Sequence, residues 1–105
     1  MTAGVEPDAA AIATLVTALP QITGLHSGHF GEIATLLPSR RVPGVRIRPT
    51  EITVGVTGRY PATAAEIGTA VRAAIGPVDR PVHVHIGDIA APTATVVAAI
   101  IEEHP

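Results

Sequence analysis

The stretch VPGVRIRPTEITVGVTGRY, residues 42–60, decides the fold of this chain. Apolar and polar residues alternate in both of its halves, and this period of two is typical of half-buried β-strands. Pro49 and Thr50 separate the two halves, and proline suits the second position of a type I turn. The stretch therefore predicts a β-hairpin.

The apolar residues also predict the register of this hairpin. We expect Ile47 to pair with Ile52. Val45 then lies opposite Val54, and the apolar side chains share one face of the hairpin. A shift of one residue would move one apolar row to the wrong face. The opposite face carries polar residues, namely Arg46, Arg48, Thr53 and Thr57.

Length and composition limit the class of protein. The chain has 105 residues, of which 47% are apolar, enough for one domain with a core. It contains no cysteine, which excludes disulfides and thiolate chemistry. We find no signal peptide at its start, and polar residues such as Gln21 and His26 interrupt the uncharged residues 9–31 too often for a membrane span. We expect a soluble cytoplasmic protein.

The charges are unevenly distributed along the chain. The net charge is −2, yet five arginines lie within residues 40–59, where Glu51 is the only acid. They are Arg40, Arg41, Arg46, Arg48 and Arg59. Arginine suits planar, two-point contacts to carboxylate or phosphate groups. The pattern predicts a basic hairpin on an acidic body.

Two elements are predicted before the hairpin. Apolar residues recur at helical spacing and predict a helix that Asp8 or Glu6 caps. The stripe consists of Ile12, Leu15, Val16 and Leu19. Residues 21–26 are compatible with a short strand and residues 27–31 with a loop. Residues 32–38 fit either a short helical turn or an irregular buried segment.

A helix and a strand are predicted after the hairpin. Thr63 and Glu66 fit a capping box, and Gly76 with the proline that follows it ends the helix. The apolar stripe consists of Ile67, Ala70, Val71, Ala74 and Ile75, with Gly68 on the polar side. Residues 81–87 predict a strand, and the strand–helix–strand connection implies that it runs parallel to residues 52–56.

These elements predict the α+β class, with two layers: a small mixed β-sheet of three or four strands and helices packed on one face. The opposite face would expose arginines, threonines and histidines. We expect a single domain over residues 1–105, with residues 1–7 as a loose leader and residues 90–105 as a carboxy-terminal helical extension. Its helix, residues 93–103, packs either on its own domain or on another copy of the chain.

Several segments carry a family resemblance through their order and spacing. They are LPSRRVPGVRIR (37–48), ITVGVTGRY (52–60), AEIGTAVRAAI (65–75) and PVHVHIGDI (81–89). Together they resemble the alkaline shock protein family of bacterial envelope stress response proteins, in an actinobacterial form, although Pro61 replaces a glycine usual in the family. The resemblance implies a small α+β fold without catalytic residues. It also implies self-association and a cytoplasmic protein that a small membrane-anchor protein can hold at the membrane.

Two histidines form the one candidate metal site in the sequence. His83 and His85 leave the same face of a strand, and two imidazoles can bind Zn²⁺ or Cu²⁺ if a third ligand joins them. His26, His29 or Asp88 could supply that ligand. The alternative is a pair of half-exposed histidines on a polar face. Because neither cysteine nor an HExxH motif is present, we expect no metal and no other cofactor.

The arginines have three interpretations. They form a solvated sheet face, a docking surface for an acidic protein segment or another copy, or a nucleic-acid surface. The last is disfavoured because Tyr60 is the only aromatic nearby and the chain is acidic overall. We therefore expect a non-enzymatic scaffold or adaptor without a small-molecule substrate. Its partner contacts would be made by Arg40, Arg41, Arg46, Arg48 and Arg59; a nucleic-acid-binding module is the alternative.

Overall fold

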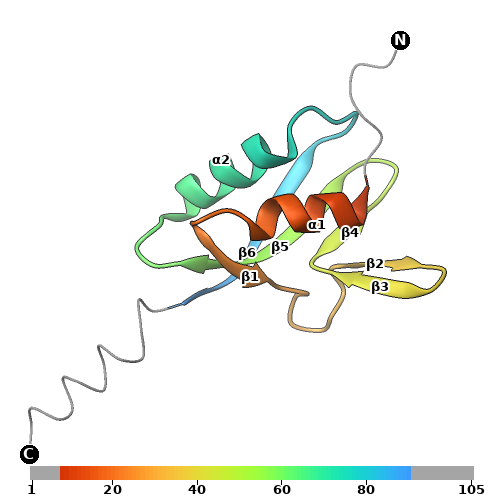
Figure 1. Cartoon of the computed structure of the whole chain (residues 1–105), viewed down its shortest axis with the longest axis horizontal. Coiled ribbons are helices and arrows are strands. Elements are labelled where there is room, and N and C mark those ends of the chain that lie inside the picture. The colour runs from red at the N-terminus through yellow and green to blue at the C-terminus, as the bar shows by residue number, and fades with distance from the viewer. Residues whose placement is uncertain (1–7, 91–105) are drawn as a thin grey trace, which may run out of the picture.

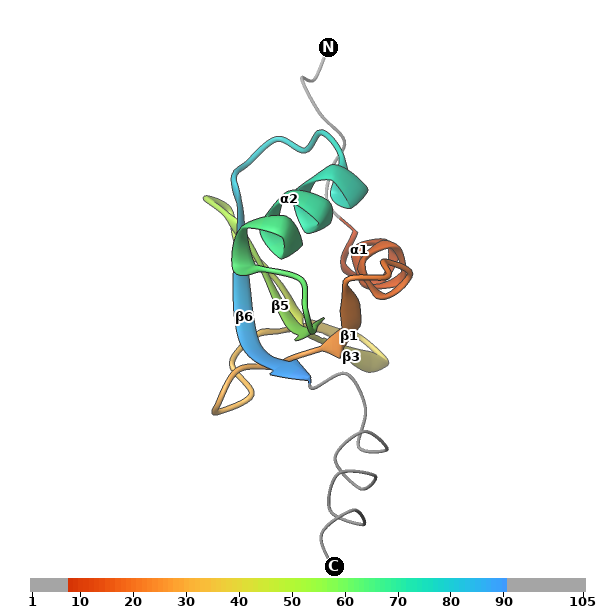
Figure 2. The ribbon, with the colours of Figure 1, turned by 90° about the vertical axis from the view of Figure 1, so that its left-hand side faces the viewer.

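The computed structural model describes residues 8–90, which form two layers (Figure 1). Helices α1 (Ala9–Thr17) and α2 (Ala64–Ile75) form one layer. The other is a four-stranded sheet of β1 (Ile22–Leu25), β4 (Val45–Ile47), β5 (Ile52–Arg59) and β6 (Val82–Ala90). Figure 2 shows both helices on the same side of this sheet. The predicted α+β class, with helices on one face, is confirmed.

Strand β5 is the centre of the sheet. One of its edges pairs with β6 in parallel along its whole length, from Ile52 opposite Val82 to Arg59 opposite Ala90. The other edge is shared by two antiparallel strands, β4 beside the first part of β5 and β1 beside the last part. The sheet is therefore mixed, and the predicted parallel strand after α2 is confirmed.

The predicted register of the hairpin is also confirmed. Ile47 pairs with Ile52 and Val45 with Val54. Of the side chains that these strands direct towards the helices, those of Val45, Ile52, Val54 and Val56 are fully buried, and Ile47 is partly buried against the same core. The fully buried core comprises Val16, Val45, Ile52, Val54, Val56, Ile67 and Val71. Burying each such side chain contributes about 1.5–3 kcal/mol.

Both helices begin and end at residues that satisfy free backbone groups. Asp8 accepts hydrogen bonds from the N–H groups of Ala10 and Ala11, at 3.0 and 3.2 Å. The predicted capping box at α2 is present, because the Glu66 N–H donates to the Thr63 hydroxyl and the Thr63 N–H donates to the Glu66 carboxylate. Each cap stabilises its helix by about 1 kcal/mol.

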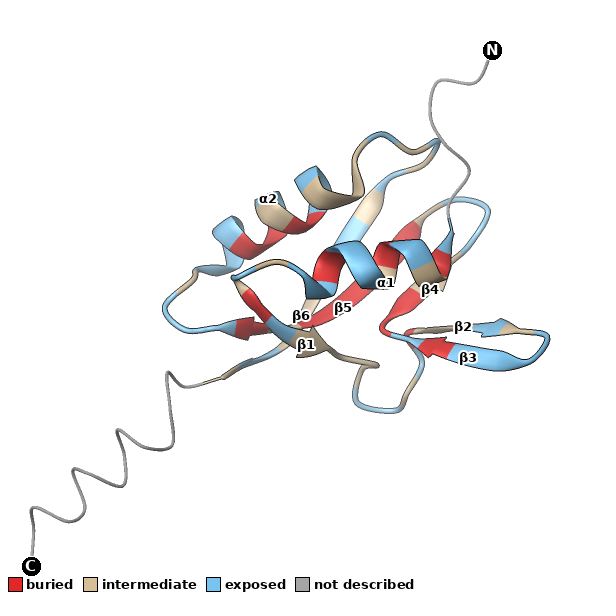
Figure 3. Cartoon of the chain, in the orientation of Figure 1, coloured by how far each residue is buried: buried red, intermediate tan, exposed pale blue. Residues whose placement is uncertain are grey.

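The segment 32–38 differs from its prediction, since it forms a strand. β2 (Ala34–Leu37) pairs antiparallel with β3 (Arg40–Pro43) in a separate two-stranded sheet. Thr35 lies opposite Val42, which is buried in the core. The consecutive leucines at the end of β2 concealed the alternation that marks a strand. Figure 3 shows how much of this small sheet is exposed compared with β5.

Two further side-chain predictions were wrong. Leu15 belongs to the predicted apolar stripe of α1, yet 45% of it is exposed. Gly68 was assigned to the polar side of α2 but is buried. The Arg72 side chain folds back close to Gly68, and its Nε donates to the Val82 carbonyl at 3.1 Å. An arginine stem therefore covers this glycine.

The second face of the sheet is less open than predicted. Thr53 is only 8% exposed, and Gly55 is buried. The loop after β1 crosses this face: the carbonyl of His26 and the side chain of Ile33 lie so close to Gly55 that a side chain there would collide with them. β5 is therefore covered on both faces.

Some predictions fall outside the described residues, namely the leader 1–7 and the helix 93–103. Within residues 8–90, no helix is long and apolar enough to cross a membrane.

Candidate binding surface

An exposed surface lies where the loop after β1 meets the β2–β3 hairpin. We call it the hairpin surface and define it as Phe30, Leu36 and Arg41. Phe30 is 94% exposed and Leu36 is 80% exposed, which makes them the most exposed large apolar side chains in residues 8–90. The other large apolar side chains described there are more deeply buried.

Local backbone geometry holds Phe30 outward. Gly28 and Gly31 have φ angles of 85° and 75°, a left-handed conformation that glycine adopts easily. The Ile33 N–H donates to the Ser27 carbonyl at 2.9 Å and closes the loop at its base. Phe30 therefore lies at the tip of a short closed loop, away from the core.

Arg41 joins this loop to the hairpin. Leu36 and Arg41 are cross-strand partners, so their side chains leave the same face of the small sheet. The Arg41 Nη2 donates to the Gly31 carbonyl at 2.8 Å, next to Phe30. The Arg41 side chain therefore shares a face with Leu36 and reaches the backbone beside Phe30. Arg40 is exposed too, but it precedes Arg41 by one residue and so leaves the opposite face of the small sheet. The Arg40 side chain makes no hydrogen bond to another described residue.

Arg46 is not the outward-facing side chain that the sequence predicts. It is partly buried, and its Nη1 lies 3.5 Å from the Glu32 carbonyl that it faces. Its Nε is buried without a hydrogen-bond partner among residues 8–90. The loop after β1 therefore lies over Arg46. Arg48, two residues further along, is exposed as predicted.

Arg59 lies far from the other arginines of the predicted set. It is at the last position of β5, seven residues after Ile52, which corresponds to about 23 Å of extended strand. Its Nε donates to the Pro20 carbonyl at 2.9 Å, so it fastens the turn between α1 and β1. The five arginines therefore do not form one surface.

The histidines of β6 separate into two environments. His83 is exposed, and its Nε2 lies 3.6 Å from the Glu51 carboxylate. His85 is partly buried, and its ring centroid lies 6.0 Å from that of His26. The His26 Nδ1 accepts the Gly28 N–H at 3.0 Å and is thereby occupied. In the described part of the chain, no three His, Cys, Asp or Glu side chains are arranged to hold a metal ion.

Glu32 stabilises the loop beneath Phe30. Its carboxylate accepts the Phe30 N–H at 3.0 Å. Hydrogen bonds from its own backbone N–H and from that of Phe30 hold the pKa of Glu32 below its ordinary value, and the nearby His85 and Arg46 act in the same direction. An ionised Glu32 therefore favours the loop conformation that presents Phe30.

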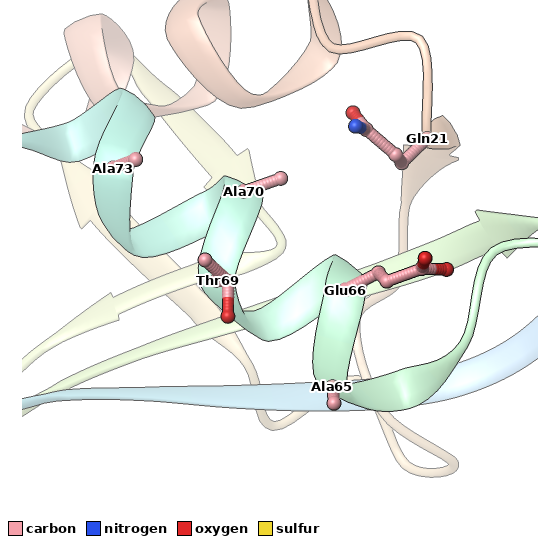
Figure 4. Close-up of a pocket in the computed structure, with 6 residues that line it drawn as sticks. All are labelled: Gln21, Ala65, Glu66, Thr69, Ala70 and Ala73. Atoms are coloured by element: carbon pink, nitrogen blue, oxygen red, sulfur yellow. The ribbon is translucent and has the colours of Figure 1, made fainter.

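A second surface feature is an open groove beside α2 (Figure 4). It is lined by Gln21, Ala65, Glu66, Thr69, Ala70 and Ala73. Its floor consists mainly of alanines, and its polar rim carries the Glu66 carboxylate. The side chain of Gln21 extends from the α1–β1 turn towards α2, and its Oε1 is buried without a hydrogen-bond donor among residues 8–90.

Sequence reasoning missed both the exposed apolar side chains and the groove. A lone phenylalanine near two glycines is a weak signal of an exposed loop tip. The alanines of α2 are ordinary helix formers in the sequence. Only the helical spacing of Ala65, Ala70 and Ala73 around Glu66 indicates that they share one side of the helix. Comparisons with protein-family models, with curated proteins and with solved structures found no match to this chain. The family resemblance therefore stays a prediction.

Proposed function

We propose that this protein is a non-enzymatic scaffold or adaptor that associates with copies of itself through the hairpin surface. The observation that carries the proposal is the exposure of Phe30 and Leu36 on either side of Arg41. Aromatic residues and arginine are enriched at the centres of protein interfaces, where they supply much of the binding energy. Single exposed apolar residues are common, but here two of them are the neighbours of one arginine side chain, Leu36 across the strand pair and Phe30 next to the Gly31 carbonyl.

The family resemblance supports the same proposal from the sequence. It adds a role in the envelope stress response, a cytoplasmic location and a small membrane-anchor protein as a second partner. A fold of this class alone would not indicate these functions. They belong to the proposal on the basis of the resemblance.

The positions of the arginines give little support to the alternative, a nucleic-acid-binding module. Arg41 and Arg59 donate to backbone carbonyls, and Arg46 lies under a loop. A nucleic-acid surface needs several cationic side chains placed so that they contact successive phosphates of one strand. Arg59 lies at the opposite end of β5 from Arg48, so these cations cannot act together on one short segment.

Size-exclusion chromatography with light scattering of the full chain, over a wide range of concentration, tests the proposal. We expect the mass of the wild type to rise with concentration. The double variant Phe30→Ser/Leu36→Ser should remain a monomer, because it lacks both apolar contacts.

A matched control is Leu15→Ser, which removes another exposed apolar side chain from α1, outside the hairpin surface. It should associate as the wild type does. A wild type that stays monomeric at every concentration would refute self-association. A double variant that associates normally would refute the hairpin surface.

A further inference from the structure

We infer that the groove beside α2 is the docking site for the hairpin surface of another copy, so that the copies join head to tail. The inference rests on the proposed self-association and identifies the second half of the contact. It is drawn from the chemical complementarity of two surfaces that lie on different sides of the molecule.

The groove offers hydrogen-bond acceptors above an apolar floor. The Gln21 Oε1 is buried and receives no donor from residues 8–90, which is a costly arrangement unless a partner supplies one. Glu66 uses one carboxylate oxygen to accept the Thr63 N–H at 2.8 Å, and a carboxylate can accept several further donors. Among its described lining residues the groove has no basic side chain. Its natural occupant is therefore apolar and carries a cation.

The hairpin surface has these properties. Leu36 and Phe30 supply apolar side chains that find no core in their own molecule. The Arg41 side chain uses only its Nη2, in the bond to the Gly31 carbonyl, so its other guanidinium N–H groups have no acceptor among residues 8–90. Guanidinium groups form strong hydrogen bonds with carboxylates. Docking would therefore set Arg41 against Glu66 and an apolar side chain against the alanine floor.

The two surfaces lie on opposite sides of one molecule. In Figure 1 the β2–β3 hairpin extends to the right, whereas the beginning of α2 and the turn before β1 lie at the left. A molecule therefore cannot fill its own groove with its own hairpin. Because the contact joins two different surfaces, each copy added to an open chain leaves one free hairpin and one free groove, and the chain grows until the rotation between copies closes it into a ring.

Complementary variants of the full chain test this arrangement. Leu36→Asp disables the hairpin surface and leaves the groove intact. Ala73→Arg fills the groove and leaves the hairpin intact, since Ala73 is an exposed helical position outside the capping box. We expect each variant alone to associate about tenfold more weakly than the wild type, or worse. An equimolar mixture should form dimers of unlike variants and nothing larger.

Sedimentation velocity distinguishes the outcomes, with Ala11→Arg as the control. Ala11 is an exposed alanine of α1 that does not line the groove beside α2, and its variant should assemble as the wild type does. Restored dimers in the mixture show that both variants are folded. Wild-type-like assembly of either variant alone, or a mixture that stays monomeric, would overturn the head-to-tail contact. A monomeric wild type would instead overturn the proposed self-association itself.

Discussion

Strand β5 and the β2–β3 hairpin are both built from apolar residues, but they use them differently. In β5 the residues from Ile52 to Val56 are all buried, because helices cover one face and the loop after β1 covers the other. In the hairpin, Val42 reaches the core while Leu36 stays 80% exposed. The difference separates the apolar residues that form the core from those that stay exposed.

The largest expected effect separates these two regions by stability. Ile52→Ala should lower the free energy of unfolding by about 2–5 kcal/mol, because it leaves a cavity in a fully buried site. Leu36→Ala should change it by less than about 0.5 kcal/mol. Urea denaturation monitored by circular dichroism, at concentrations where the protein is a monomer, measures both. An equal loss of unfolding free energy in both variants would show that Leu36 is part of the core.

Two glycines of the main sheet differ in the space around them. An alanine at Gly55 would collide with the His26 carbonyl, whereas an alanine at Gly24 of β1 would meet no atom within 4 Å. Gly55→Ala should therefore destabilise the protein by about 1–3 kcal/mol, as overpacking does. Gly24→Ala should be tolerated. Thermal melting of the two variants checks this, and a tolerated Gly55→Ala would mean that the loop does not lie on β5.

A third prediction concerns the helix that bears the groove. Thr63→Ala removes the hydroxyl that accepts the Glu66 N–H and should destabilise the protein by about 1 kcal/mol. Thr63→Ser retains that hydroxyl and serves as the control. Urea denaturation should place the serine variant near the wild type. An equally large loss in both variants would show that the threonine methyl group, and not the cap, stabilises α2.

The smallest expected effect is a pH dependence in the loop beneath Phe30. Because the folded protein holds the pKa of Glu32 below its ordinary value of 4.5, ionised Glu32 adds stability above that pH. The contribution is lost as the pH falls through the lowered pKa. Glu32→Gln should therefore be less stable than the wild type near neutral pH, and the gap should narrow at about pH 3. A gap that does not change between the two pH values would contradict this role.

The main sheet could be predicted because its signals are local. The alternation within residues 42–60 determined the register of β4 and β5, and the capping box located the beginning of α2. β2 could not be predicted with the same method, because Leu36 and Leu37 are both apolar although only one side of the small sheet faces the core. An apolar residue on an exposed face interrupts the alternation of apolar and polar residues by which a half-buried strand is recognised.

The candidate site was predicted less well, for a tertiary reason. Arg46 of β4 and Arg48, just beyond its end, alternate with apolar residues as predicted, but the sequence does not show that a distant loop lies over Arg46. The separation of Arg59 followed from the length of β5 alone and could have been predicted. The exposure of Phe30 depends on two glycine turns and on the Ile33–Ser27 hydrogen bond, which only the folded chain shows.

Thiol cross-linking between copies tests whether Leu36, left exposed on the hairpin, lies in the groove of another copy. The chain has no cysteine, so single cysteines mark single positions. Leu36→Cys and Ala73→Cys proteins are mixed and treated with a short bis-maleimide, with Arg48→Cys replacing Leu36→Cys in the control. We predict strong cross-linking of unlike variants in the first mixture only. Equal, weak cross-linking in both mixtures would show that the hairpin does not occupy the groove of another copy.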